Sequence, residues 1–386
     1  MRWRIADATI ALVGVGLAVL LRLSLLDFKS IDYFNYTKVW YGVLKTTGFS
    51  AFGGDFSNYN LPYLYVLYLV ARFLPDVPAH IATKIPSLAA DFVAAWLVFR
   101  IVRLKYADSI FPSFAALAIL FAPTLVLNSA FWGQADAIYA SAILASVYFL
   151  MRRQPNRALL LFGLALAFKA QALLLLPLIV GLVLRRDISW RHLAWVPAVL
   201  FLALLPAMLA GRPFGDLLLI YPAQAGQYEQ LSLHAPSAWA WIPDTGRFYP
   251  YFYPAGLILS AAAGLAFALA LYWAPAKLTP SLILELAVLS VTIMPFLLPK
   301  MHERYFYLAD VLCIVLAFHV PKYYWAPLLM ISISFFSYQP TLFGAEPVPM
   351  GLLALGVCIL IIGLSRHVLL LMSATSTDDG GVVAVQ

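Results

Sequence analysis

The chain has 386 residues, of which 63% are hydrophobic and 11% are charged, and its mean hydropathy is +0.87. Apolar runs of about 20 residues recur from Ala6 almost to the C-terminus, which is typical of a polytopic helical membrane protein and not of a soluble domain. The net charge of +7 lies in short clusters at the ends of these runs, so it indicates membrane topology rather than a nucleic-acid-binding face.

The runs predict an all-α fold, a polytopic bundle of about 11 to 13 transmembrane helices or half-helices that forms one integral membrane domain over residues 1–372. A small, acidic, disordered cytoplasmic tail is expected over 373–386. The first helix, over 6–26, is not followed by a small-x-small cleavage site, so it is expected to stay in the membrane. Further helices are predicted over residues 80–104, 111–130, 135–151, 193–210, 251–273, 281–298, 304–319, 325–340 and 350–372.

Two apolar segments are too short or too polar to be simple spans. The run Leu61 to Phe73 has only about 13 residues, so it is predicted to be an interfacial or re-entrant helix within a large first outer loop. The run from Ala158 to Leu184 carries Lys169 and Gln171 in its middle, which predicts a hairpin of two half-helices with its tip near the outer leaflet. Asp91 interrupts another apolar helix, where a structural contact to a neighbouring helix is the favoured explanation.

The basic clusters orient the chain, because Lys and Arg accumulate in cytoplasmic connections. With the clusters and both termini in the cytoplasm, the polar segments gather on the outer face: residues 27–80, 131–136, the Lys169/Gln171 tip, 211–249 and the sequence "PKMHERY" at 299–305. This distribution predicts a membrane enzyme whose active site faces outward, toward the periplasm if the host membrane is a bacterial inner membrane. No internal repeat supports the paired halves of many secondary transporters.

Asp32 lies in "KSIDYFNY", just after the outer end of the first helix. A carboxylate at the mouth of a membrane cavity, flanked by Tyr33 and Tyr36, could accept a proton from an incoming hydroxyl. The alternative is an ordinary loop or helix-capping aspartate.

Three other polar segments are candidates for substrate binding. The aromatic segment around Asn60 and Tyr63 could stack against a sugar or a lipid, or form an interfacial aromatic belt. In "WGQAD", Gln134 and Asp136 could bind a polar headgroup or cap a helix. Lys169, among apolar neighbours, requires an anionic partner, which could be a bound phosphate or a buried aspartate.

The sequence "PKMHERY" supplies Lys300, His302, Glu303 and Arg304 at a predicted helix start. Two cations beside a histidine could bind a phosphate, since Arg gives bidentate hydrogen bonds and Lys adds a point charge. The alternative is a membrane-interface belt in which Glu303 pairs with a neighbouring cation. A metal site is disfavoured, because Phe306 replaces the second histidine of HExxH and the cations repel a divalent ion.

Taken in order, these segments resemble the membrane-embedded GT-C glycosyltransferases that use polyprenyl-phosphate sugars, in particular bacterial mannosyltransferases similar to the second GPI mannosyltransferase. The resemblance is carried by Asp32 and by "NYNLPYLYVLY", "KIPSLAADFVAAW", "NSAFWGQADAIYA", "FKAQALLLLPL" and "KMHERYFYLADVL". It departs from the family in having one proline in "NLPYLY" and no Asp-x-Asp arrangement at Asp32.

The resemblance implies that Asp32 is the catalytic base and that a polyprenyl-phosphate sugar is the donor. No cofactor is expected, and the missing Asp-x-Asp arrangement, together with the cations beside His302, disfavours a metal. It implies that Lys169 binds the donor phosphate and that the motif of His302, Glu303 and Arg304 serves the donor phosphate or the acceptor. With the charge argument, Lys169, Lys300, His302 and Arg304 are expected to bind the phosphate. The substrate-binding residues are expected to be Tyr33, Tyr36, Asn60, Tyr63, Gln134, Asp136, Gln171 and Glu303. Transfer of a hexose, with mannose favoured, would then invert the anomeric centre.

The acceptor is expected to be a hydroxyl of a lipid-linked glycan, a glycolipid or a protein, and the segment 211–249 is expected to select it. A secondary transporter or lipid flippase is the main alternative, since it also needs buried charges in a helical bundle. A membrane O-acyltransferase is a second alternative, for which His302 is the one supporting residue.

Overall fold

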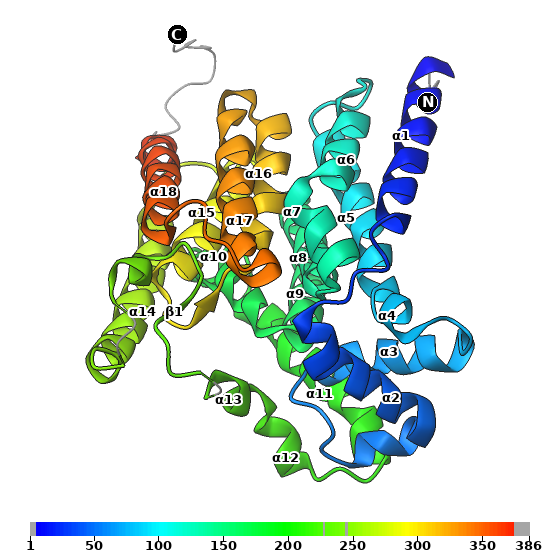
Figure 1. The fold of residues 1–386 in the computed structure, drawn as a ribbon. Helices are drawn as coiled ribbons and strands as arrows, with labels where there is room; N and C mark the ends of the chain where they lie inside the picture. The colour runs from blue at the N-terminus through cyan, green and yellow to red at the C-terminus, as the bar shows by residue number, and fades with distance from the viewer. Residues whose placement is uncertain (1–4, 227, 244–245, 374–386) are drawn as a thin grey trace.

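The structure is a computed structural model that describes residues 5–226, 228–243 and 246–373 (Figure 1). The N-terminal helices are α1 (Ile5–Leu23), α2 (Lys38–Thr47), α3 (Leu61–Phe73), α4 (Ala79–Ala82), α5 (Ile85–Arg103), α6 (Phe111–Phe121), α7 (Pro123–Val126), α8 (Asp136–Met151), α9 (Pro155–Phe168) and α10 (Leu176–Leu184). The C-terminal helices are α11 (Trp195–Leu209), α12 (Phe214–Leu218), α13 (Ile220–Ala225), α14 (Tyr249–Trp273), α15 (Pro280–Leu297), α16 (Tyr307–His319), α17 (Trp325–Phe343) and α18 (Met350–Ser373). Of the predicted tail, Ser373 ends α18 and 374–386 lie outside the described residues.

In the part of the chain that the structure describes, five helices are long and apolar enough to cross a membrane, or six if the bent pair formed by α6 and the helical segment Pro123–Trp132 is one span. Several shorter apolar helices of 10–17 residues pack among them. One of these is α3, whose 13 residues match the expected short helix of the first loop. In Figure 1, α3 runs across the direction of α1 and α6, as an interfacial helix would.

The predicted hairpin between Ala158 and Leu184 is confirmed as two short helices, α9 and α10. Lys169 separates them in an extended conformation, with φ −157° and ψ 133°, and a 3-10 helix over Ala170–Leu175 follows. Pro177 lies in the first turn of α10, where its missing N–H costs no helical hydrogen bond.

The continuous helix predicted over 111–130 is wrong, because the chain bends by 50° between α6 and Pro123. A proline disfavours helical geometry in the residue before it, and Ala122 has ψ 122°. After α7 a π-helix over Leu127–Trp132 ends at Gly133, whose φ of 83° favours glycine.

The predicted helix start at "PKMHERY" is also wrong. Met301–His302 forms strand β2, which pairs in parallel with β1 (Ser232–Leu233), and α16 begins only at Tyr307. The loop expected over 211–249 contributes α12, α13 and β1, and its carbonyls accept hydrogen bonds from the N–H groups of Lys300 (2.8 Å) and Glu303 (3.0 Å). These hydrogen bonds hold "PKMHERY" as extended backbone beside that segment.

The basic clusters meet at one end of the bundle. Lys105 donates a hydrogen bond to the His319 carbonyl at the end of α16, and Arg153 and Arg185 donate to carbonyls of the connection between α14 and α15. The start of α1 and the end of α18 lie at the same end, while β1, α12 and α13 lie toward the other (Figure 1). This arrangement matches the predicted separation of basic connections from polar site segments.

Asp91 makes the interhelical contact that was favoured for it. Its carboxylate pairs with Arg22 of α1 at 2.9 Å and accepts a hydrogen bond from Ser129 at 2.5 Å, with both charged side chains almost fully buried. Arg22 also donates to the Leu120 carbonyl at 2.8 Å, so one ion pair joins α1, α5 and the end of α6.

Replacing Asp91 by leucine should destabilise the protein by about 3 kcal/mol or more, because it leaves the Arg22 charge buried without a partner. The double variant Arg22→Met/Asp91→Leu should recover most of that loss. The free energy of unfolding of the purified protein in detergent measures both effects. An equal loss in the single and double variants would contradict this account.

Candidate active site

A cavity of about 1260 Å³ lies between the first loop, the break between α9 and α10, and "PKMHERY". It brings together residues that are far apart in the chain, from Asp32 to Met350. Among the residues that line it are the following members of the predicted site: Asp32, Tyr33, Tyr36, Asn60, Tyr63, Gln134, Lys169, Gln171, Lys300, His302, Glu303 and Arg304. Asp136 does not line the cavity, because it is fully buried beneath it.

Asp32 follows α1 and precedes a π-helix over Tyr33–Thr37. Its Oδ2 accepts hydrogen bonds from Trp132 Nε1 at 2.9 Å and from Gln134 Nε2 at 2.6 Å. Both donors come from the bend after α7, so the bend fixes the carboxylate at the cavity wall. Because both donors are neutral and bind one oxygen, Asp32 keeps a second oxygen that can accept a proton.

Lys169 and Asp136 form a buried ion pair, and Asn128 donates a second hydrogen bond to Asp136 Oδ2 at 2.9 Å. Lys169 also lies over the rings of Tyr139 and Tyr305, at 5.7 and 5.6 Å from their centroids. The extended backbone at Lys169 turns its side chain into the bundle, where the carboxylate, the rings and the cavity surround it. Its two expected partners, an aspartate and a phosphate, are therefore compatible.

Arg304 donates a hydrogen bond to Glu303 at 3.0 Å, and its Nε lies 3.8 Å from Asp136 Oδ2. Its guanidinium packs over Trp132 at 5.4 Å and over Tyr305 at 5.8 Å. Burial alone would lower the pKa of Arg304, but the charge of Glu303, with smaller contributions from Tyr305 and Asp136, raises it above its usual value. Arg304 therefore stays a cation at the cavity surface.

His302 lies beside Glu303, with its Nδ1 3.8 Å from the carboxylate, and its ring packs against those of Tyr228 and Tyr305, with centroids 5.2 and 5.1 Å away. Burial lowers the pKa of His302 below its usual 6.5, and Arg304 adds to this effect, although the hydrogen bond with Glu303 opposes it. His302 is therefore a neutral hydrogen-bonding group near neutral pH.

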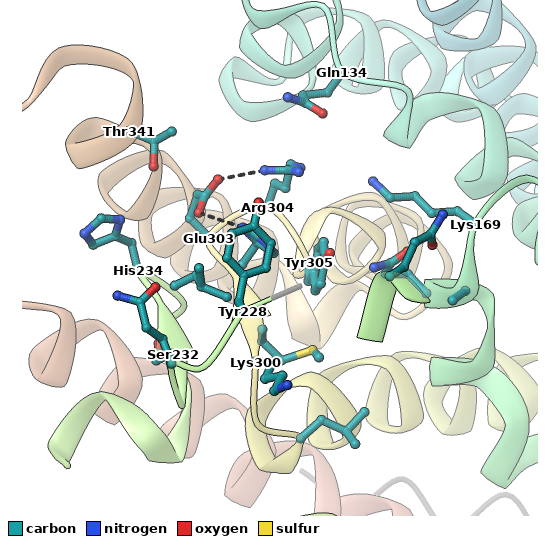
Figure 2. A pocket seen from close by; sticks show the side chains of 18 of the residues that line it. Gln134, Lys169, Tyr228, Ser232, His234, Lys300, Glu303, Arg304, Tyr305 and Thr341 are labelled. Carbon is teal, nitrogen blue, oxygen red and sulfur yellow. Dashed lines mark hydrogen bonds and ion pairs between the residues drawn. The ribbon is translucent and has the colours of Figure 1, made fainter. Parts of the chain in front are cut away.

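Lys300 occupies a different part of the cavity wall. Its ammonium lies over Tyr253 at 4.5 Å and over Tyr249 at 5.3 Å, both at the start of α14. Figure 2 shows Lys300 set apart from Arg304, with Tyr228 and Tyr305 between them in the view. Joint binding of one phosphate by these two cations stays a prediction, with Lys300 held against α14 and Arg304 held by Glu303.

Three of the predicted substrate-binding residues of the first loop, Tyr36, Asn60 and Tyr63, lie on one aromatic wall of the cavity. Asn60 donates to the Phe168 carbonyl at 3.0 Å and accepts from Gln224 at 3.0 Å, which links the loop to α9 and α13. Tyr63 packs against Tyr59 at 5.0 Å. Tyr36 joins this wall through Trp40, whereas Tyr33 lines the cavity and packs against Phe34 and His80. The amide oxygen of Gln171, in the 3-10 helix after Lys169, is buried without a hydrogen-bond partner among the described residues.

Four residues of the site were not predicted. Trp132 and Asn128 lie within the segment quoted as "NSAFWGQADAIYA". Pro123 and Gly133 are sequence signals for the bend, but they do not show that it turns these two side chains toward Asp32 and Asp136. Tyr305 lies within "PKMHERY". Tyr228 had no signal, because its place against His302 depends on strand pairing far along the chain.

Among the described residues, no group of three or more His, Cys, Asp and Glu side chains could hold a metal ion. The metal-free reaction stays a prediction, as do the absence of a cofactor and the individual residue roles.

No protein-family model and no curated protein matches the sequence. Two crystal structures of ArnT from Cupriavidus metallidurans do match the fold. The ArnT structure bound to undecaprenyl phosphate has a TM-score of 0.57 and 15% identity, over 94% of this chain and 73% of that one. The apo structure has a TM-score of 0.54 and 16% identity, over 95% and 74%. This likeness confirms the predicted fold, an all-α polytopic membrane bundle, which the chain shares with ArnT.

The lowered pKa of His302 predicts a specific dependence of stability on pH. The folded protein binds this proton less well than the unfolded chain, so the neutral His302 stabilises the fold above its unfolded pKa, and this contribution is lost as the pH falls. The stability advantage of the wild type over His302→Gln should shrink from about pH 7.5 to about pH 5.5. Unfolding in detergent at several pH values measures this difference. Two parallel curves would contradict the account.

Proposed function

We propose that the protein is a glycosyltransferase that moves a hexose from a polyprenyl-phosphate sugar to a hydroxyl group on the outer face of the membrane. The observation that carries the proposal is one cavity lined both by the Asp32 carboxylate and by the cations Lys169 and Arg304. Asp32 accepts hydrogen bonds only from neutral groups among the described residues, those of Trp132 and Gln134. The GT-C fold shared with ArnT supports it, since one ArnT structure holds undecaprenyl phosphate.

In this reaction Asp32 accepts the proton of the acceptor hydroxyl while that oxygen attacks the anomeric carbon. The leaving phosphate is an anion, so it needs charge stabilisation and no general acid. Arg304 and Lys169 supply the charge, His302 adds a neutral hydrogen bond, and Lys300 extends the positive potential toward α14. A single displacement of this kind inverts the anomeric centre and needs no metal.

The aromatic first-loop wall would hold the sugar, because flat rings and amide groups suit a polyhydroxylated surface. Mannose is the proposed hexose, following the mannosyltransferases that the sequence resembles. The proposed acceptor is a lipid-linked glycan or a glycolipid, with a protein as the other option. The bacterial inner membrane, with the site toward the periplasm, is the proposed location.

A transporter or flippase would move its substrate without breaking a bond. The test is therefore to give the detergent-purified protein a polyprenyl-phosphate mannose with a candidate acceptor, and to measure free polyprenyl phosphate and glycosylated acceptor. Release of polyprenyl phosphate that depends on the acceptor supports a transferase. Movement of the intact lipid across vesicles, without cleavage for any acceptor or sugar, would support the transporter.

Asp32→Asn should lower transfer by at least about 10²-fold, because asparagine can still accept hydrogen bonds from Trp132 and Gln134 but cannot take the proton. Asp27→Asn is the matched control, since Asp27 is in the same loop and its side chain is 97% exposed. The control should stay within about twofold of the wild type. Full transfer by Asp32→Asn would remove the central residue of the mechanism.

A further inference from the structure

Asp136 lies directly behind the two cations proposed to bind the donor phosphate. It is fully buried and does not line the cavity, whereas Lys169 and Arg304 both do. Its Oδ1 pairs with Lys169, and its Oδ2 accepts the Asn128 amide at 2.9 Å. Because each oxygen has a fixed partner on the protein, Asp136 is placed to orient other side chains and not to touch substrate.

Arg304 lies near Asp136 but does not form a hydrogen bond with it. The distance of 3.8 Å from Arg304 Nε to Asp136 Oδ2 is too long for a hydrogen bond, and Nε is buried without a hydrogen-bond partner among the described residues. The rest of the guanidinium is held by Glu303 at 3.0 Å. Arg304 thus keeps one buried N–H that faces the Asp136 carboxylate and is satisfied by no group among the described residues.

The connected cluster contains two cations, Lys169 and Arg304, and two carboxylates, Asp136 and Glu303. Its formal charge is zero. The proposed donor is a phosphodiester with one negative charge, while the product is a phosphomonoester that approaches two at neutral pH. Excess positive charge would hold the product more tightly than the donor, whereas a neutral cluster binds the donor through hydrogen bonds and still lets the product leave.

We propose that Asp136 is a positioning residue that orients Lys169 and Arg304 and limits their attraction for the product, polyprenyl phosphate. This inference rests on the proposed transferase function. In that transfer the bond between the sugar C1 and the phosphate oxygen breaks, and a bond from C1 to the acceptor oxygen forms. The acceptor proton goes to Asp32, and the phosphate leaves with the electron pair. The added negative charge on the phosphate is what Asp136 then opposes.

The test compares the binding of a short-chain polyprenyl phosphate to the full-length wild type and to Asp136→Asn, without turnover. Removing the carboxylate should tighten this binding roughly tenfold. In the transfer assay kcat should fall through slow product release, while KM for the donor does not rise. A purely structural role for Asp136 would instead weaken binding and raise KM.

Asp310→Asn is the matched control, because Asp310 is also fully buried in the bundle, is bonded to Ser334 at 2.8 Å and does not line the cavity. It should not change the affinity for polyprenyl phosphate. Asn128→Ala keeps the Asp136 charge but loses one orienting hydrogen bond, so it should lower kcat without tightening product binding.

Weaker or unchanged binding by Asp136→Asn, or equal tightening in Asp310→Asn, overturns the inference while leaving the transferase proposal standing. No binding by the wild type overturns both. If Asp136→Asn cannot be purified alone, polyprenyl phosphate added during solubilisation should recover it, because the phosphate replaces the missing charge. The same addition should not recover an unstable Asp310→Asn, and failure to recover Asp136→Asn counts against the inference.

Discussion

Backbone that leaves helical geometry inside a membrane protein must find other hydrogen-bond partners, since the lipid offers none. Three segments meet this constraint near the cavity: the bend and π-helix from Ala122 to Gly133, the extended residue Lys169, and the short strand Met301–His302. After the bend, backbone hydrogen bonds resume in a π-helix. Beside the strand, the N–H groups of Lys300 and Glu303 donate hydrogen bonds to carbonyls of the segment around β1. Irregular backbone of this kind is tolerated where it is buried in protein or lines a cavity, and that is where these segments lie.

The side chains of the candidate site follow from these three breaks. The bend turns Trp132 and Gln134 toward Asp32, the extended residue turns Lys169 toward Asp136, and the strand and its following turn present His302 and Arg304. Between these groups the cavity wall is largely phenolic. Burial raises the pKa of Tyr228 and of Tyr305 to about 12, so these rings stay neutral and can donate hydrogen bonds or lie beside a cation without adding charge.

Much of the bundle could be predicted from the sequence, because hydropathy, basic clusters and prolines act locally. The short helix α3, the hairpin broken at Lys169 and the structural contact of Asp91 all followed from single segments. The strand at "PKMHERY" could not, because it depends on hydrogen bonds to a segment about 70 positions earlier in the chain. The ion pairs could not be predicted for the same reason. The sequence identifies the carboxylates and the cations, but the pairing between them depends on how the bend, the extended residue Lys169 and the strand Met301–His302 pack together.

The position of Asp32 depends on contacts outside its own loop. Lys84 donates to the carbonyls of Leu26 at 2.9 Å and Phe28 at 2.8 Å, and Ser30 donates to the Trp132 carbonyl at 3.0 Å. The loop after α1 is therefore fixed to the start of α5 and to the bend after α7 before any substrate contact is considered. The cations belong to other segments, the α9–α10 break and the turn before α16. The separation between Asp32 and Arg304 is thus set by how these helices pack, because Trp132 donates a hydrogen bond to Asp32 and lies against the Arg304 guanidinium.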